Sequence, residues 1–206
     1  MKQTLYEPLK HTVYAAGVRF HINTGFRRVL QSYAVLKDEV LDYPDKIDFC
    51  LRLLIRGGRF LLPFLSRNRK VGLFEAVFRE YVNTGDKEAD APKAFDFDQD
   101  APFIYAAFRE CYGIDLLGKD RDLHWWKFIQ LFKGLPENTR IMQIISIRTR
   151  PLPKATKYNA QERQNLMRLK MLYRVELTEE EQRKQREAGF RKIAMAMEAM
   201  AQRKER

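Results

Sequence analysis

The chain has 206 residues, of which 45% are hydrophobic and 12% aromatic, and this composition excludes wholesale disorder. Lysine and arginine number 38 against 27 acidic residues, and the resulting formal net charge of +11 favours nucleic acid, an acidic protein or anionic lipid as a partner. The sequence lacks the ~18-residue apolar run of a membrane span, an apolar leader segment and any CxxC pair. We therefore expect a reduced, cytoplasmic, soluble protein that is not inserted in a membrane.

The first predicted element is a β-hairpin. Residues 11–14 and 18–22 are rich in β-branched and aromatic side chains, and Gly17 supplies the turn between them. The apolar spacing then becomes helical, with Thr24 as the predicted N-cap. The stripe of this first helix consists of Phe26, Val29, Leu30 and Tyr33.

Two further helices are predicted before residue 84. The second begins after Pro44 and ends at Gly57 and Gly58, and the third begins at Gly72. The buried stripe of the second is Ile47, Cys50, Leu51 and Leu54. The stripe of the third is Phe74, Val77, Phe78 and Tyr81. The polar residues 84–92 that follow are typical of a loop between segments.

Three more short amphipathic helices are predicted up to residue 150. The fourth follows Asp100 as N-cap, the fifth follows Asp120 or Asp122, and the sixth begins at Pro136. Their apolar stripes are Ile104, Ala107, Phe108 and Cys111; Trp125, Phe128, Ile129 and Phe132; and Ile141, Ile144 and Ile145. Short helices of this kind are stable only when they pack on one another.

The composition changes after Pro153. Two predicted capping boxes, Asn159 with Glu162 and Thr178 with Glu181, begin more highly charged helices. We therefore predict a mainly α fold, with a small N-terminal β-hairpin, a compact bundle of about six short helices and a charged C-terminal helical arm. The predicted domains are residues 1–153, helical and globular with the hairpin, and residues 154–206, the arm.

Residues 95–100 carry aspartates at alternate positions, like the start of a calcium loop. An EF-hand needs glycine at the sixth position and glutamate at the twelfth, and this sequence has Ala101 and Ala107 there. We therefore interpret Asp100 as a helix N-cap and Asp96 and Asp98 as solvated loop residues. No metal site is expected.

Two adjacent tryptophans follow His124. Trp125 falls on the buried stripe of its helix, which favours a place in the core. Trp126 falls beside that stripe, and a partly exposed indole there could stack on a base or contact a partner protein. We predict Trp126 as a partner-binding residue, with packing inside the chain as the alternative.

Residues 49–74 contain six basic side chains and no acidic one. The six are Arg52, Arg56, Arg59, Arg67, Arg69 and Lys70. Such a stretch is the best local candidate for binding the phosphates of nucleic acid. We favour the other interpretation, a solvated helix face whose cations pair with carboxylates elsewhere in the fold.

The last thirty residues carry a thin apolar stripe on a charged background. Its predicted partner-binding residues are Phe190, Ile193, Met197 and Met200. Methionines adapt to varied apolar surfaces, so this stripe could grip a partner helix. The alternative is a helix docked on the chain's own core or on its twin in a dimer.

Catalytic motifs are absent from the sequence. There is no glycine-rich phosphate loop, no G-x-S-x-G, no HExxH, and the three histidines (His11, His21 and His124) have aromatic or strand neighbours. We therefore expect a protein that is not an enzyme and needs no cofactor.

Several segments resemble one family of phage proteins. The most distinctive are Leu123–Phe128, with its two tryptophans, and Leu135–Thr149, which ends in Ile-Arg-Thr; Phe95–Phe108 and Tyr112–Leu116 are similar too. These segments resemble the bacteriophage gene-product-fifteen family of long-tailed phages and prophages, over roughly residues 5–175.

This resemblance implies a role in building phage tails. Members resemble tail assembly chaperones in gene context, which implies that this protein binds the tape measure protein, a companion chaperone and tail tube protein. It implies a place in the host cytoplasm and absence from the mature virion. Two other functions stay open, namely a nucleic-acid-binding module that uses residues 52–70 and a minor structural tail component.

Overall fold

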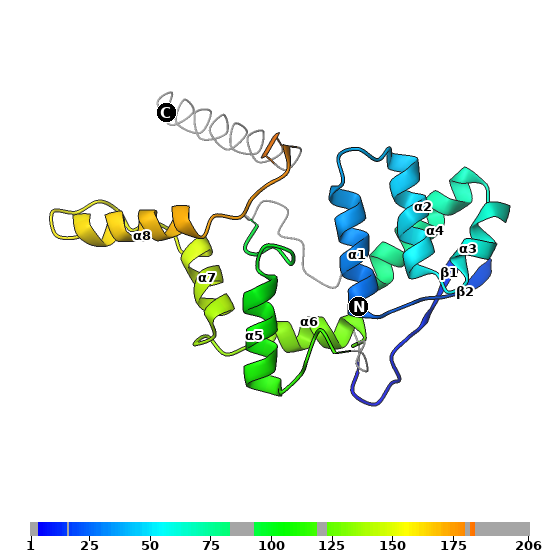
Figure 1. Cartoon of the computed structure of the whole chain (residues 1–206), viewed down its shortest axis with the longest axis horizontal. Coiled ribbons are helices and arrows are strands. Elements are labelled where there is room, and N and C mark those ends of the chain that lie inside the picture. The colour runs from blue at the N-terminus through cyan, green and yellow to red at the C-terminus, as the bar shows by residue number, and fades with distance from the viewer. Residues whose placement is uncertain (1–3, 16, 83–92, 119–122, 180–181, 184–206) are drawn as a thin grey trace, which may run out of the picture. The chain divides into compact units, whose positions relative to one another are not determined.

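The protein is mainly helical, as predicted, with one small hairpin near its N-terminus (Figure 1). The structure is a computed structural model that describes residues 4–15, 17–82, 93–118, 123–179 and 182–183. None of its helices within these ranges combines the length and apolar character of a membrane span. The chain divides into two compact units, unit 1 (Met1–Asp86 and Tyr105–Leu135) and unit 2 (Lys87–Ile104 and Pro136–Arg206).

The predicted hairpin is confirmed at the start of unit 1. Strand β1 (Thr12–Ala15) pairs antiparallel with β2 (Val18–His21), in a register that sets Val13 opposite Phe20. Both of those side chains are buried, whereas their neighbours along the strands are more exposed. This alternation is the period of two that one buried sheet face requires.

Helices α1 (Phe26–Lys37) and α2 (Tyr43–Leu54) follow the hairpin. The predicted stripe of α2 is confirmed, since all four of its side chains are at most 3% exposed. The predicted cap of α1 is wrong. Its N-cap is Gly25, while the Thr24 hydroxyl lies 2.9 Å from Nδ1 of His11.

The chain after α2 forms four consecutive helical segments. These are α3 (Gly58–Leu61), the 3₁₀ turn η1 (Leu62–Phe64), α4 (Arg67–Val77) and the π-helical turn η2 (Phe78–Val82). The prediction that Gly72 begins a helix is wrong, because α4 starts five residues earlier, after Ser66. Gly58 likewise does not end α2, which stops at Leu54, but begins α3.

An aromatic stack forms part of the core of unit 1, between α1, α5 (Ala101–Tyr112) and α6 (Trp125–Lys133). The Phe128 ring lies between those of Phe26 and Phe108, with centroid distances of 4.8 and 5.1 Å. Trp125 stacks on Phe128 and donates its indole N–H to the carbonyl oxygen of Val82, 3.1 Å away. The predicted core position of Trp125 is confirmed, and its only polar atom is satisfied there.

Unit 2 contains α7 (Arg140–Thr149) and α8 (Ala160–Leu172), together with residues 93–104. Helix α7 begins at Arg140 and not at Pro136, because residues 136–139 form a turn closed by Thr139. The position predicted for the start of α8 is correct, but its capping box is not. The Asn159 side chain bonds to the backbone of Thr156 and Lys154 instead of capping the helix.

The aspartates of residues 95–100 have roles that differ from the prediction. Asp96 is buried, and its carboxylate accepts hydrogen bonds from the backbone N–H groups of Asp98 and Gln99, which closes a tight turn. Asp100 immediately precedes α5, as predicted, but its carboxylate bonds Arg148 at 2.6 and 2.9 Å. Only Asp98 is the exposed loop residue that was expected.

Four of the predicted features lie outside the described residues. They are the loop at 84–92, Asp120 and Asp122 ahead of the fifth helix, Glu181 of the second capping box, and the apolar stripe of Phe190, Ile193, Met197 and Met200. The fifth predicted helix, α6, begins at Trp125 with His124 as its N-cap. The boundary predicted after residue 153 stays a prediction.

Candidate interaction surface

The basic stretch divides into paired and unpaired cations. Asp48 on α2 bonds both Arg52, at 2.8 Å, and Lys70 of α4, at 2.5 Å. Although burial alone raises it, the pKa of Asp48 is held below its ordinary value by hydrogen bonds and charge attraction from Lys70 and Arg52. These two cations match the alternative interpretation, in which the basic side chains pair with carboxylates of the fold.

The other four cations are exposed. We call Arg56, Arg59, Arg67 and Arg69 the arginine rim. Within the part of the chain that the structure describes, none of the four pairs with a carboxylate. Their guanidinium groups therefore remain available, in that part of the chain, to carboxylates or phosphates of a partner.

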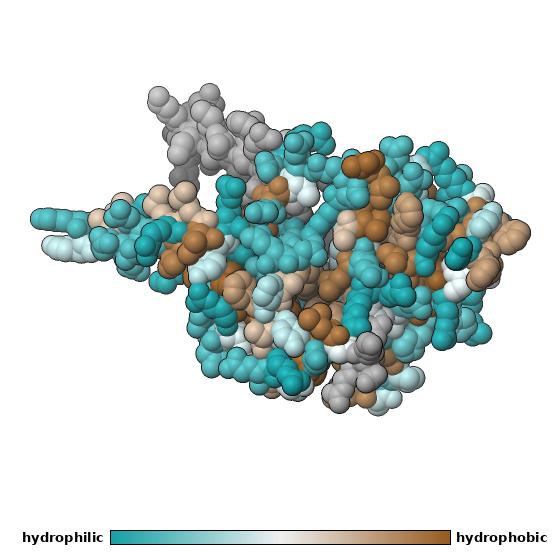
Figure 2. Space-filling view, in the orientation of Figure 1, coloured by the Kyte–Doolittle hydropathy of each residue, from teal (hydrophilic) through white to brown (hydrophobic). Residues whose placement is uncertain are grey.

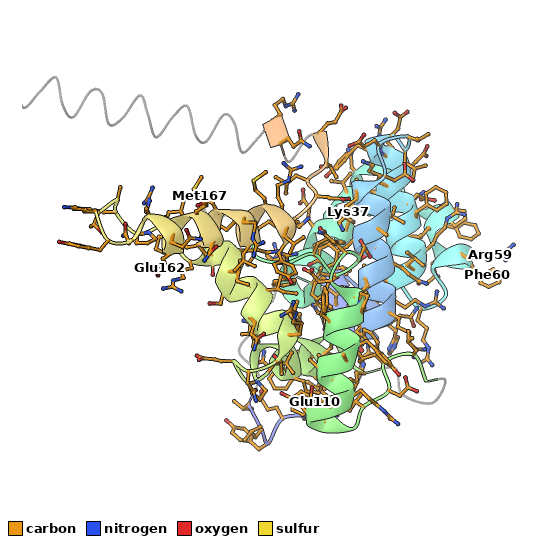
Figure 3. All side chains as sticks on the ribbon, turned by 60° about the vertical axis from the view of Figure 1, so that its left-hand side comes forward. Lys37, Arg59, Phe60, Glu110, Glu162 and Met167 are labelled. Carbon is orange, nitrogen blue, oxygen red and sulfur yellow. The ribbon has the colours of Figure 1, made fainter. Side chains whose placement is uncertain are left out.

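In the sequence, between Arg59 and Arg67, lies a group of exposed apolar side chains that the sequence analysis did not predict as a site. Phe60 is 75% exposed, Leu61 is 47% exposed and Phe64 is 86% exposed. We call these three residues, on α3 and η1, the aromatic tip. In Figure 3 Arg59 and Phe60 project from the same end of unit 1, and in Figure 2 apolar side chains appear among polar ones where Figure 1 labels α3.

The backbone beneath the aromatic tip is tightly constrained. Gly57 has φ +73°, a left-handed conformation that glycine adopts without steric cost. Gly58 packs so closely on α2 that an added Cβ would lie 3.0 Å from the carbonyl oxygen of Leu51. Leu62 is 1% exposed and anchors the segment in the core. The aromatic tip is thus presented by a fixed support.

A pocket of about 410 Å³ lies between the first turns of α2 and α4. It is lined by Tyr43, Pro44, Asp45, Ile47, Asp48, Arg67, Lys70 and Val71. The pocket therefore combines apolar walls with the Asp48–Lys70 ion pair. Arg67 belongs both to this lining and to the arginine rim.

His124 has a structural role at the start of α6. Its Nδ1 accepts a hydrogen bond from the Trp126 N–H at 3.1 Å, so the neutral ring carries its proton on Nε2, 3.4 Å from the Lys10 carbonyl oxygen. The His11 ring lies edge-on to it at 5.2 Å. Burial lowers the pKa of His124. The hydrogen bond to the Lys10 carbonyl oxygen raises this pKa, and the nearby His11 and Lys127 lower it further, so that the net shift is downward.

The predicted partner-binding residues are not brought together by the described structure. Trp126 is half-buried on α6, and the other four lie outside the described residues. The signal that could have revealed the aromatic tip is the run Phe-Leu-Leu-Pro-Phe at residues 60–64, which is flanked by arginines on both sides.

Two further observations bear on chemistry. Within the described ranges, no three side chains of His, Cys, Asp or Glu form a group that could hold a metal ion. Burial raises the pKa of the Cys50 thiol to about 12, so this thiol is protonated and poorly nucleophilic at neutral pH.

The structure is that of a mainly helical protein with exposed basic and apolar side chains on α3, η1 and the adjoining residues. Residues 5–175 match the family described as bacteriophage Gp15 protein. The chain therefore belongs to this family and is a phage-related protein. Neither a curated protein nor a solved structure matches the chain.

Proposed function

We propose that the protein is a non-catalytic tail assembly chaperone or adaptor, which binds the tape measure protein and tail tube subunits during tail morphogenesis. It works in the host cytoplasm beside a companion tail chaperone and is absent from the mature virion. Membership of the bacteriophage family supports the phage context. The observation that carries the binding role is the aromatic tip, because a chaperone must offer exposed apolar side chains to an apolar client.

The test is co-expression with the tape measure gene of the same tail-gene cluster. We expect the soluble fraction of tape measure protein to rise, and a tagged pull-down washed at high salt to recover it. Equal aggregation of the tape measure protein with and without this chain would contradict the proposal.

The C-terminal stripe is the second place where a client could bind. Changing Phe190, Ile193, Met197 and Met200 to serine should reduce the soluble tape measure fraction, because it removes the stripe's apolar contacts. The matched control changes Lys192 and Glu198 to glutamine, since these positions lie off the stripe at helical spacing. A loss that is equal in both variants would argue against the stripe.

A second candidate function is nucleic-acid binding through residues 52–70. The four arginines of the rim, which have no carboxylate partner among the described residues, favour it, whereas the pairing of Arg52 and Lys70 with Asp48 reduces the number of cations available. Changing Arg56, Arg59 and Arg67 to glutamine should then flatten the salt dependence of DNA affinity. The further alternative, a minor structural tail component, predicts that the protein is found in purified virions.

A further inference from the structure

The aromatic tip combines exposed apolar side chains with a buried support. Phe60 and Phe64 are 75% and 86% exposed, although Leu62 between them and Gly58 just before them in the chain are buried. The buried residues show that the segment is held against unit 1, so the exposure does not come from a loose loop. When a partner covers exposed apolar side chains, the free energy of the system falls. Little backbone entropy is lost on binding here, because the segment is already held in place by its buried residues.

We propose that the aromatic tip and the arginine rim together form the docking surface for an acidic amphipathic helix of a partner protein. The inference rests on the proposed function, because it names the chemistry of the client segment that the protein would bind. Phe60, Leu61 and Phe64 insert between the apolar side chains of the partner helix. Carboxylates beside that apolar stripe accept paired hydrogen bonds from the guanidinium groups of the rim.

Charge complementarity selects this occupant. Residues 49–74 contain no acidic side chain, and the rim has no carboxylate partner in the described parts of the chain. An acidic helix can therefore bind without first breaking an ion pair seen in the structure. A second copy of the same surface would bring four arginines against four others, and that repulsion disfavours self-association through the tip.

The apolar composition favours a protein over nucleic acid. Phe60 and Phe64 each offer a ring for base stacking, but Leu61 between them in the sequence does not, and two of the six cations in the stretch are already bound to Asp48. The pocket beside Arg67, where Tyr43 and Val71 line the wall beside the Asp48–Lys70 ion pair, adds a further site for a side chain of the partner. A helix with both carboxylates and apolar side chains can contact the arginine rim, the aromatic tip and the pocket.

The experiment uses the full-length chain and four defined probes, with binding followed by fluorescence anisotropy and, for vesicles, by sedimentation. The first probe is a synthetic helical peptide of leucine, alanine and glutamate, and the second is the same peptide with lysine in place of glutamate. The third is a single-stranded thymidine oligonucleotide, and the fourth is a vesicle of phosphatidylglycerol and phosphatidylcholine. We expect the acidic peptide to bind at least about tenfold more tightly than the lysine peptide.

Two variants locate the binding on the surface. F60S with F64S should weaken binding of the acidic peptide about tenfold or more, because aromatic anchors contribute strongly to interfaces. R59Q with R67Q should weaken it and reduce its dependence on salt. The control is Y158S with L172S, which removes two side chains that are 93% and 70% exposed on unit 2 and should leave binding unchanged. Circular dichroism checks that each variant is folded.

Three outcomes would overturn the inference. They are equal binding of the acidic and lysine peptides, tighter binding of the oligonucleotide or the vesicle, and self-association of the wild type that F60S with F64S abolishes. The same variants are then used in the tape measure co-expression. If the peptide fails to bind but the tape measure protein stays soluble, the docking surface is wrong and the proposed function stands. If the peptide binds at the tip but the tape measure protein aggregates, the proposed function is wrong and the docking surface stands.

Discussion

Arg148 connects three segments of unit 2. Its guanidinium group bonds the carboxylate of Asp100 and donates to the backbone carbonyl oxygens of Ala94 and Tyr173. Both members of the ion pair are buried, with side-chain exposures of 7% and 1%. A buried pair of this kind stabilises mainly because either charge alone would be costly to bury.

We therefore expect Arg148→Met to lower the free energy of unfolding by about 3–5 kcal/mol, because it leaves the buried Asp100 carboxylate without its cation. Chemical denaturation measures the change. The control is Arg52→Met, which removes one partner of an exposed pair and should cost about 0–1 kcal/mol. Similar losses in the two variants would contradict the special role of Arg148.

The lowered pKa of His124 leads us to expect that the free energy of unfolding of unit 1 depends on pH. Since burial lowers this pKa in the folded chain, the unfolded chain binds more protons once the pH falls below the ordinary value of about 6.5. The free energy of unfolding should be level above that value, and should decrease as the pH falls from there toward the folded pKa.

The variant His124→Asn should flatten this decrease, because asparagine can still accept a hydrogen bond from the Trp126 N–H but does not titrate. Denaturation at a series of pH values tests the prediction. His21→Asn, at an exposed position on β2, should keep the dependence of the wild type. An unchanged pH dependence in the His124 variant would assign the effect to other groups.

At the level of helices, two glycines should respond to alanine in opposite directions. Gly72 lies inside α4 with open space around it, so Gly72→Ala should raise the free energy of unfolding by about 0.5–1 kcal/mol. Gly57→Ala should lower it by about 1–2 kcal/mol, since φ is +73° there. Thermal unfolding of the two variants beside the wild type gives the signs, and a stabilising Gly57→Ala or a destabilising Gly72→Ala would contradict the assigned conformations.

The same elements show what could be predicted from the sequence. Apolar periodicity located the hairpin and the stripe of α2, because both extend over enough residues to show a period. Apolar periodicity misplaced the start of α4, because the first turn of this helix contains Arg67 and Arg69 and has no apolar stripe. The aromatic tip could not be predicted in this way, because α3 is only four residues long and has no period to read.

Polar partners that are distant in the sequence were also beyond prediction. The pairing of Asp48 with Lys70 and of Asp100 with Arg148 spans 22 and 48 residues, and no local pattern specifies it. The family resemblance identified the family, which apolar periodicity could not do, because the resemblance depends on particular side chains such as Trp125 and Trp126. The match over residues 5–175 confirms it.

At the level of the whole molecule, each unit is made from two separate stretches of chain. Residues 136–175 include α7 and α8, and these helices bond to each other where Lys170 donates to the Arg148 carbonyl oxygen at 2.7 Å. Within the same unit, the Tyr173 hydroxyl accepts a hydrogen bond from Arg140. These contacts cross the boundary that the sequence analysis places after residue 153.

A fragment of residues 1–153 tests that boundary. Because it lacks α8 and Tyr173, we expect the amide hydrogens of α7 to exchange faster in the fragment than in the full chain, while those of α1 and α2 keep their protection. A fragment of residues 1–179 is the control and should protect α7 fully. Equal protection of α7 in all three proteins would support the boundary after residue 153.

The separation of Asp100 from Arg148 also sets an order of events on the ribosome. The two residues are 48 positions apart, so at ~5–20 residues per second Asp100 is synthesised roughly 2 to 10 seconds before its cation. During that interval the last residues of unit 1, up to Leu135, are completed. All residues of unit 1 are therefore synthesised before Arg148, the ion-pair partner of Asp100, exists. Unit 2 can complete its fold only after unit 1 has been synthesised.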